Sequence, residues 1–231
     1  MNSRKWTPAL LFMVLFAMQS TASNAESPKI GVATSIKPNA EGGVGANLRG
    51  LSAGSELRAR ETVRTGNLGQ ADLVFIDDTN LTVGPTSEVL LDEFVYDPTG
   101  SSGRVVMQAT RGAFRFVTGK QDHRAYQLKT PYGTLGVRGT VVRVDVLDPA
   151  EKKRRRDKCD VRVTVDQGEG EFTLRDPQTG EQKHYRVRAG QSICVKDGAV
   201  TYSTAAAPPP PSPPGGITPP CVPISPATTC Q

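Results

Sequence analysis

Residues 71–83 read ADLVFIDDTNLTV, two short alternating segments on either side of a polar turn. Apolar side chains stand at Ala71, Leu73 and Phe75, and again at Leu81 and Val83. Alternation with a period of two is typical of strands that bury one face. Aspartate and asparagine bond to their own backbone and tolerate positive φ, so residues 77–80 predict a tight turn between two strands.

The same pattern recurs along the chain, as VVRVDV at 141–146 and VRVTV at 161–165. Turn residues return about every ten positions, glycine (23) and proline (18) are abundant, and aromatic residues make up only 6%. This composition is unlike that of a helical bundle. We therefore expect one all-β domain over residues 29–204, with strands of three to six residues. A two-sheet sandwich and a short β-solenoid of stacked strand–turn units both fit this spacing.

The N-terminus has the layout of a secretory signal peptide. Arg4 and Lys5 precede an apolar run, ALLFMVLFAM at 9–18, and small residues follow at Ser23 and Ala25. The run falls short of the roughly 20 apolar residues that a membrane anchor needs. We expect residues 1–25 to be removed by cleavage between Ala25 and Glu26. The mature protein is then expected to have no transmembrane span and to be periplasmic or secreted.

The C-terminal segment, residues 205–231, reads AAAPPPPSPPGGITPPCVPISPATTCQ and contains ten prolines. Proline has no amide hydrogen and a fixed φ, so the segment is not expected to join a sheet or a helix. We predict a disordered, extended Pro-rich tail. It acts either as a passive spacer or as a docking strip for another envelope component.

Export would permit disulfides, and four cysteines allow three pairings. The simplest prediction joins Cys159 to Cys194 in the folded part and Cys221 to Cys230 in the tail. The alternative for the first pair is two separate buried thiols. None of the spacings matches a zinc site, and we expect no metal or other cofactor.

The charge balance is mild, with 28 basic against 23 acidic residues. Removing residues 1–25 leaves 26 against 23, too small an excess to indicate nucleic acid as a partner. Six of the basic residues lie together in one loop: Lys152, Lys153, Arg154, Arg155, Arg156 and Lys158. This is either a solvated loop or a contact for anionic lipid headgroups, phosphates or an acidic protein face.

The sequence holds no zinc-protease or nucleotide-binding motif. It has no H-E-x-x-H and no phosphate-binding glycine loop. The adjacent acids Asp92 and Glu93 would point to opposite faces of a strand, which makes them a poor acid–base pair. His123 and His184 are isolated in sequence and are expected on the surface. We predict a protein that is not an enzyme.

Two stretches stand out: VRTGNLGQADLVFIDDTNLTVGPTS at 63–87 and TPYGTLGVRGTVVRV at 130–144. Together they resemble the FecR domain family, over about residues 58–165. Asp78 stands where that family usually has glycine, and Val142 where it often has phenylalanine. The residues that carry the resemblance are Thr65, Gly66, Phe75, Asp77, Gly136, Arg138, Gly139 and Thr140.

The second motif combines closely spaced glycines with one arginine. Gly133, Gly136 and Gly139 recur every three residues, which allows positive φ or close backbone approach at successive bends. Arg138 is expected either to be buried as a clamp against backbone carbonyls or a carboxylate such as Asp77 or Asp78, or to contact an anion or a partner. We favour the structural clamp.

The resemblance also implies a kind of function. Well-known FecR-domain proteins regulate iron uptake through a cytoplasmic segment that acts on a sigma factor, one membrane span and a periplasmic FecR domain. That domain contacts the signalling domain of an outer-membrane transporter. The sequence shows no counterpart of the first two parts, so only an exported protein-binding or signalling module of the cell envelope is implied. The alternative is a surface scaffold or adhesin, and a carbohydrate-active enzyme is less favoured.

Overall fold

The computed structural model describes residues 27–99, 102–122, 124–151, 154, 158–175 and 179–204. They form strands joined by turns and one short 3₁₀ helix, η1 (Pro149–Glu151), which confirms the all-β prediction. The strands are β1 (Lys29–Lys37), β2 (Ala40–Val44), β3 (Asn47–Gly50), β4 (Glu56–Arg58), β5 (Thr62–Thr65), β6 (Gln70–Phe75), β7 (Asn80–Val83), β8 (Glu88–Val95), β9 (Arg104–Val117), β10 (Tyr126–Thr130), β11 (Gly133–Val146), β12 (Val161–Arg175), β13 (Gln182–Arg188), β14 (Gln191–Lys196) and β15 (Ala199–Thr204).

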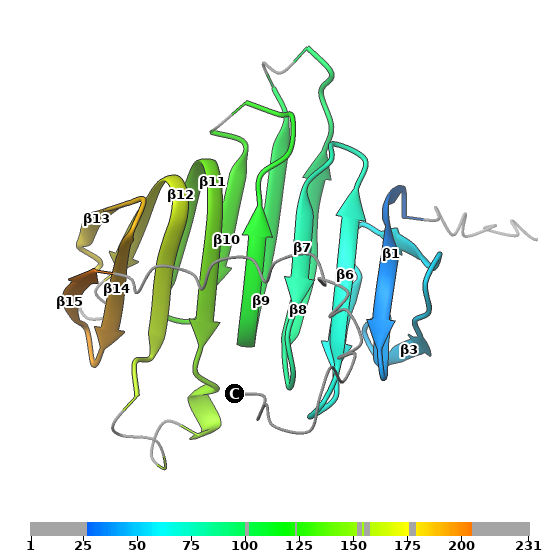
Figure 1. Cartoon of the computed structure of the whole chain (residues 1–231), viewed down its shortest axis with the longest axis horizontal. Coiled ribbons are helices and arrows are strands. Elements are labelled where there is room, and N and C mark those ends of the chain that lie inside the picture. The colour runs from blue at the N-terminus through cyan, green and yellow to red at the C-terminus, as the bar shows by residue number, and fades with distance from the viewer. Residues whose placement is uncertain are drawn as a thin grey trace, which may run out of the picture.

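Hydrogen bonds join the strands into one mixed sheet that is folded into two layers (Figure 1). The first layer has the order β4-β1-β6-β7, then the second halves of β9 and β11, the first half of β12, and β14-β15. The second layer has the order β3-β2-β5-β8, then the first half of β9, β10, the first half of β11, the second half of β12, and β13. Among the strands of the described residues, only β9 and β10 pair in parallel.

Three long strands pass from one layer to the other, and each has a glycine with positive φ where it bends. These are Gly112 in β9 (φ 104°), Gly139 in β11 (φ 55°) and Gly168 in β12 (φ 80°). A Cβ on Gly112 would lie 2.0 Å from the Ser87 hydroxyl oxygen, and one on Gly168 would lie 2.1 Å from the Gly139 carbonyl oxygen. Glycine is required at positions 112 and 168 because a Cβ would clash there, whereas the left-handed φ of Gly139 costs most other residues about 1–2 kcal/mol.

These corners correct the expected strand length. Strands of three to six residues were predicted, whereas β9 and β11 have 14 residues each and β12 has 15. The glycine bends let a strand turn into the other layer without ending. The arrangement is therefore close to the sandwich alternative, but its two layers are parts of one sheet and share three strands.

The core lies between the layers and consists of the alternating apolar side chains that the sequence singled out. Phe75 on β6 stacks on Phe94 on β8 with ring centroids 5.5 Å apart, and Phe116 on β9 meets Tyr126 on β10 edge-on at 5.9 Å. Both contacts cross from the first layer to the second. One connected cluster of buried side chains extends from β1 to β14.

The 71–83 segment folds as predicted. Residues 76–79 form the turn between β6 and β7, and Asp78 has a φ of 65°. Asp78 thus takes the left-handed conformation at the position where the FecR pattern has glycine, which aspartate tolerates better than most residues.

Several predictions concern residues outside those described. They include the signal peptide, with its cleavage site at Ala25 and Glu26, and the tail with Cys221 and Cys230. The limits of the 29–204 domain also stay a prediction. Among the described residues, no helix has the length and apolar character needed to cross a membrane.

Candidate functional site

The first motif holds two turns in place. The Thr65 hydroxyl donates to the Gly84 carbonyl oxygen at 2.6 Å and accepts from the Ser87 amide at 3.0 Å. The Gly66 carbonyl oxygen accepts hydrogen bonds from the amides of Gly69 and Thr86. Both residues therefore join β5 to the turn that precedes β8, and neither presents a reactive group.

Asp77 is the centre of a buried polar network. Its side chain has 0% exposure, and its carboxylate accepts from the Thr79 amide at 3.0 Å, the Thr79 hydroxyl at 2.7 Å and the Tyr126 hydroxyl at 2.9 Å. The Gln121 side-chain amide donates to the same carboxylate at 3.4 Å. Burial, together with the nearby negative charge of Asp77, raises the pKa of Tyr126 to about 12. Asp77 thus fastens the β6–β7 turn to β10.

The two motifs meet at residues 118–121. The Lys120 amide donates to the Asp77 carbonyl oxygen at 2.8 Å. On the other side, the Thr118 hydroxyl accepts from the Thr140 amide at 2.9 Å, and the buried Thr140 hydroxyl donates to the Glu169 carbonyl oxygen at 2.9 Å. Residues separated by more than sixty positions in sequence thereby form one structural joint.

The glycine prediction is correct at two of three positions. Gly139 has positive φ, and a Cβ on Gly133 would lie 2.5 Å from the Phe172 ring. Gly136 needs neither property, because a Cβ there would have its closest contact 3.9 Å away, at the Glu171 carbonyl oxygen.

The expected clamp by Arg138 is wrong. The Arg138 side chain is exposed, and its guanidinium has no hydrogen bond or ion pair with another described residue. The carboxylates suggested for it are used elsewhere, since Asp77 serves the buried network and Asp78 pairs with Lys120. Strand alternation explains the difference, because Leu135 and Val137 are buried and Arg138, the next residue in β11, lies on the opposite, exposed side. The alternative, an anion or partner contact, remains open for Arg138.

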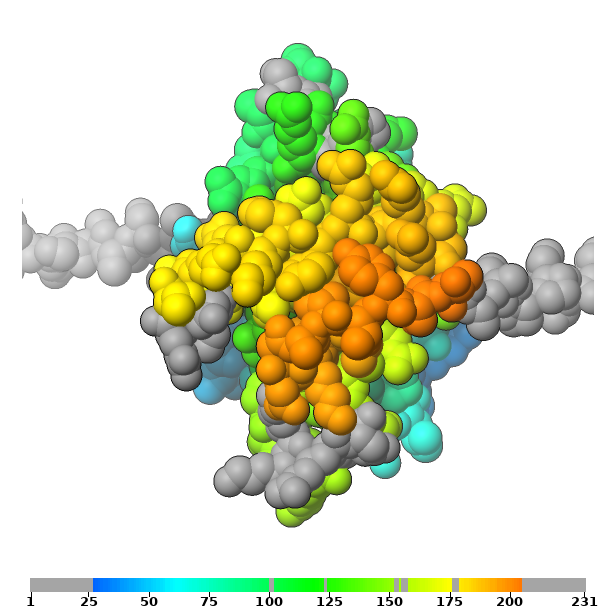
Figure 2. Space-filling view, turned by 90° about the vertical axis from the view of Figure 1, so that its left-hand side faces the viewer, coloured from blue at the N-terminus to red at the C-terminus, as the bar shows by residue number. Residues whose placement is uncertain are grey.

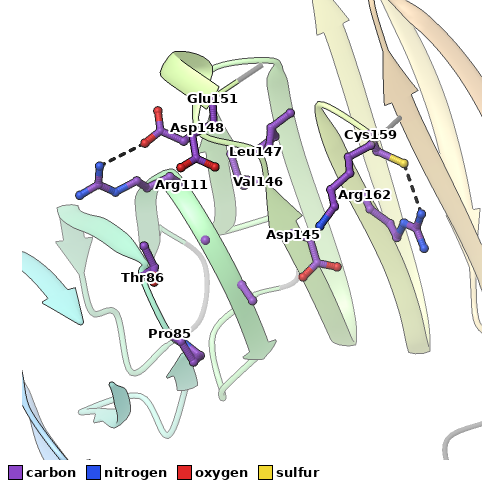
Figure 3. A pocket seen from close by; sticks show the side chains of 13 residues that line it. Pro85, Thr86, Arg111, Asp145, Val146, Leu147, Asp148, Glu151, Cys159 and Arg162 are labelled. Atoms are coloured by element: carbon purple, nitrogen blue, oxygen red, sulfur yellow. Dashed lines mark hydrogen bonds and ion pairs between the residues drawn. The ribbon is translucent and has the colours of Figure 1, made fainter. Parts of the chain in front are cut away.

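A groove of about 710 Å³ opens on the outer face of the first layer (Figure 3). Its walls come from the 84–87 turn, the corner of β9, the end of β11 and the start of β12. Arg111 crosses one wall and pairs with Asp148 at 3.2 Å and with Glu88 at 3.3 Å. On the other wall, the Arg162 guanidinium donates to the Cys159 sulfur at 3.5 Å.

Asp145 lies between these walls, next to Arg162 in the strand register. Partial removal from water raises its pKa, while Arg162, Arg143 and Lys158 act in the opposite direction. The groove therefore carries both signs of charge. The basic groups face the Asp145 carboxylate, whose charged form is less stable here than that of an aspartate in water.

A second hollow of about 460 Å³ continues along the same face and shares Ala113, Asp145 and Arg162 with the groove. The strand registers place one polar side chain per strand across it: Thr82, Arg115, Arg143, Thr164, Ser192 and Ser203. Arg143 pairs with Asp166 through two contacts at 2.8 and 3.0 Å. Arg115 is exposed and has no ion pair within the described residues. We call the groove and this hollow together the concave face.

The disulfide between Cys159 and Cys194 lies beside the concave face and links the start of β12 to β14, with the two Cα atoms 5.4 Å apart. This pairing was predicted. Of the predicted basic cluster, Lys158 lines the groove and Arg154 is exposed. Lys152, Lys153, Arg155 and Arg156 lie outside the described residues, so the anionic-contact prediction stays untested.

The acidic pair and the histidine that the structure describes have surface ion-pair partners. No group of three or more metal-ligating side chains occurs in the part of the chain that the structure describes. Asp92 and Glu93 have separate partners, Lys129 at 3.5 Å and Arg104 at 2.9 Å. His184 is exposed and lies 3.1 Å from a Glu171 carboxylate oxygen, whereas His123 lies outside the described residues.

Sequence reasoning missed the arginines of the concave face, Arg111, Arg115, Arg143 and Arg162. Two of them stand between valines, in VRV at 142–144 and 161–163, and this alternation alone places them on the outer face of a strand. Their neighbours depend on the register between strands, which the alternation does not give.

Comparison with known proteins places these features in a family. Residues 61–169 match the family model described as FecR protein. No curated protein sequence matches this chain. Two solved structures of a candidate anti-sigma factor from Parabacteroides distasonis are similar in fold, with TM-scores of 0.47 and 0.46 at 14% and 15% identity. Each alignment covers 63% of this chain and 60% of the other, so this chain matches less than two thirds of their length. Both sequence motifs and the joint between them lie within the matched residues, which confirms the resemblance to the FecR domain family over residues 61–169.

Proposed function

We propose that this chain is an exported, non-enzymatic signalling module that binds another protein of the cell envelope through its concave face. The observation that carries the proposal is the row of polar side chains across the first layer. In that row, Arg115 is exposed with no acidic partner among the described residues, beside a groove of about 710 Å³. Export is supported by the leader-like N-terminus and by the Cys159–Cys194 disulfide, since disulfides persist in oxidising compartments.

The chemistry of the face favours a polypeptide. The groove is open and carries Arg111, Arg162 and Lys158 as well as Asp145 and Asp148. Side chains of both signs, held at fixed spacing on rigid strands, give specificity for a partner with complementary charges. A partner segment with acidic side chains opposite Arg115 and Arg162 would fit this arrangement best.

The non-enzymatic part of the proposal rests on how the motif residues are used. Asp77, Thr65 and Thr140 have their hydrogen-bonding capacity occupied by backbone and neighbouring side chains. Enzyme sites need an acid, base or nucleophile held near open space. These polar residues instead hold the scaffold together.

The binding test uses charge reversal on the concave face. The double variant Arg115→Glu/Arg162→Glu and the control Arg124→Glu are purified with the unchanged chain and used to capture partners from envelope extracts. Arg124 is exposed and does not line either hollow. We expect one reproducible partner for the unchanged chain and the control, and at least a tenfold loss for the double variant. Equal capture by all three proteins would refute the role of the face.

Export is tested separately. N-terminal sequencing of the protein from fractionated cells is expected to begin at Glu26, with the protein in the periplasmic or extracellular fraction. An uncleaved chain in the cytoplasmic fraction would contradict the export proposal. The capture experiment would still test binding through the concave face, because it does not depend on export.

A further inference from the structure

The two layers end in four edge strands, and these edges differ in length and charge. Among the described residues, β4 and β15 end the first layer, and β3 and β13 end the second. β4 has three residues and β3 has four. β13 has seven and carries Lys183, Arg186 and Arg188. Short length and charge are the usual protections of an edge strand against pairing with another chain.

β15 has neither protection. It reads AVTYST, has six residues and no charged side chain, and five of the six are exposed. Val200 and Tyr202 have high strand propensity. β15 is therefore the edge best suited to accept another strand.

The hairpin geometry tells which backbone groups of β15 are free. A two-residue turn, Asp197–Gly198, with φ of 49° and 79°, joins β14 to β15 and leaves Lys196 opposite Ala199. Residues that flank such a turn exchange both of their backbone hydrogen bonds, and the pattern then alternates. Ala199 and every second residue after it therefore face β14. Val200, Tyr202 and Thr204 direct their N–H and C=O groups away from it, where no described strand pairs with them.

The same edge leaves part of the core open. Figure 2 views this end of the molecule, with β13 and β15 exposed side by side. Tyr202 is 52% exposed, and its hydroxyl donates to the Arg186 carbonyl oxygen on β13 at 3.3 Å, so its ring spans the gap between the layers. Val200 and Tyr185 are only partly buried against the core. A strand added to β15 would cover apolar surface as well as satisfy backbone groups.

We propose that this edge pairs with β15 of a second copy of the chain, antiparallel about a two-fold axis at Tyr202. Tyr202 then lies opposite its own copy, and Val200 lies opposite Thr204 of the second copy. All three outward-facing residues find partners, with about six hydrogen bonds. Two tyrosines meet where each monomer exposes one, an aromatic cross-strand pair. This inference does not depend on the proposed function.

The second copy fits better than the other occupants at hand. Pairing of β13 with its own copy would bring its basic side chains near one another, which is unfavourable. The chain's own segment 205–231 is rich in proline, which cannot donate to a sheet. β15 is uncharged, so its self-pairing brings no like charges together on that strand.

The expected association is weak. A six-residue edge buries much less than the roughly 800 Å² per partner of a standard stable interface. We expect a reversible dimer in sedimentation velocity with a dissociation constant of about 10–500 μM. Tyr202→Lys places two like charges at the two-fold axis and is expected to weaken the dimer at least tenfold, with Arg124→Glu as the unaffected control.

Cysteine crosslinking tests the register and does not depend on Tyr202→Lys folding normally. In a Cys221→Ser/Cys230→Ser background, Tyr202→Cys is expected to form an intermolecular disulfide under mild oxidation, because opposite Cα atoms in such a pair lie about 5.5 Å apart. Ser203→Cys, whose copy would lie about two residues away along the strand, is expected to crosslink several-fold less. A protein that stays monomeric to about 0.5 mM, or that crosslinks equally at both positions, would overturn the proposal. So would a dimer insensitive to Tyr202→Lys.

Discussion

Replacing Asp77 with asparagine separates a structural role of the first motif from a binding role. Three donors converge on one Asp77 carboxylate oxygen: the Thr79 hydroxyl, the Gln121 side-chain amide and the Tyr126 hydroxyl. A hydrogen bond to a charged acceptor is worth about 1 kcal/mol more than one to a neutral group. The loss of about 3 kcal/mol is partly offset because a neutral amide is less costly to bury. We expect a destabilisation of about 2 kcal/mol.

For a domain of this size, that change lowers the melting temperature by about 4–8 °C. Asp78→Asn is the matched control, since it makes the same chemical change one residue away at a surface ion pair with Lys120 and keeps a side chain that tolerates positive φ. It should cost less than about 1 kcal/mol. Circular dichroism is the suitable probe because the single tryptophan, Trp6, lies in the expected leader. Equal melting temperatures for the two variants would refute the conclusion that Asp77 stabilises the fold through its buried hydrogen-bond network.

Three further predictions concern other parts of the scaffold. In urea unfolding, Gly139→Ala is expected to lower the free energy of unfolding by about 1–2 kcal/mol because Gly139 has positive φ, whereas Arg138→Ala should change it by less than about 0.5 kcal/mol. Equal effects would contradict the requirement for glycine at the β11 corner. The double change Cys159→Ser/Cys194→Ser removes a crosslink over 35 residues and should lower the free energy of unfolding by about 3–4 kcal/mol. If reducing agent left the stability of the unchanged chain the same, the two thiols would be separate. Because the pKa of Tyr126 is raised to about 12 in the folded state, stability should fall as pH rises above about 10. In urea unfolding at pH 9 and 11, Tyr126→Phe should show a smaller drop in the midpoint than the unchanged chain. An equal drop in both proteins would contradict this prediction.

Local patterns predicted much of the fold. The alternation in 71–83 and the polar residues of the 77–80 turn are local signals, and both elements form as expected. The length of β9, β11 and β12 is a different kind of property. A glycine inside a strand pattern reads as a break or a bulge, and only the neighbouring strand shows whether the chain continues in a second layer.

The Arg138 prediction failed for a related reason. A guanidinium between two glycines fits a buried clamp as well as an exposed group when only the sequence is known. The structure resolves the choice through residues distant in sequence, since Tyr126 and Gln121 occupy the Asp77 carboxylate that Arg138 would have needed. The register that places Arg143 beside Arg115 is likewise a relation between strands and has no signature within either one.

The family motifs and the proposed binding face are connected through geometry. Thr140 and Gly139 stand at the corner where β11 enters the first layer, and the segment beyond that corner carries Arg143 and Asp145 onto the concave face. A change at the corner would therefore move both side chains relative to Arg115 without touching either of them. On the proposed function, the motif positions fix where the face lies, and the residues between them would select the partner. Proteins that share these motifs can thus share a scaffold and still recognise different partners.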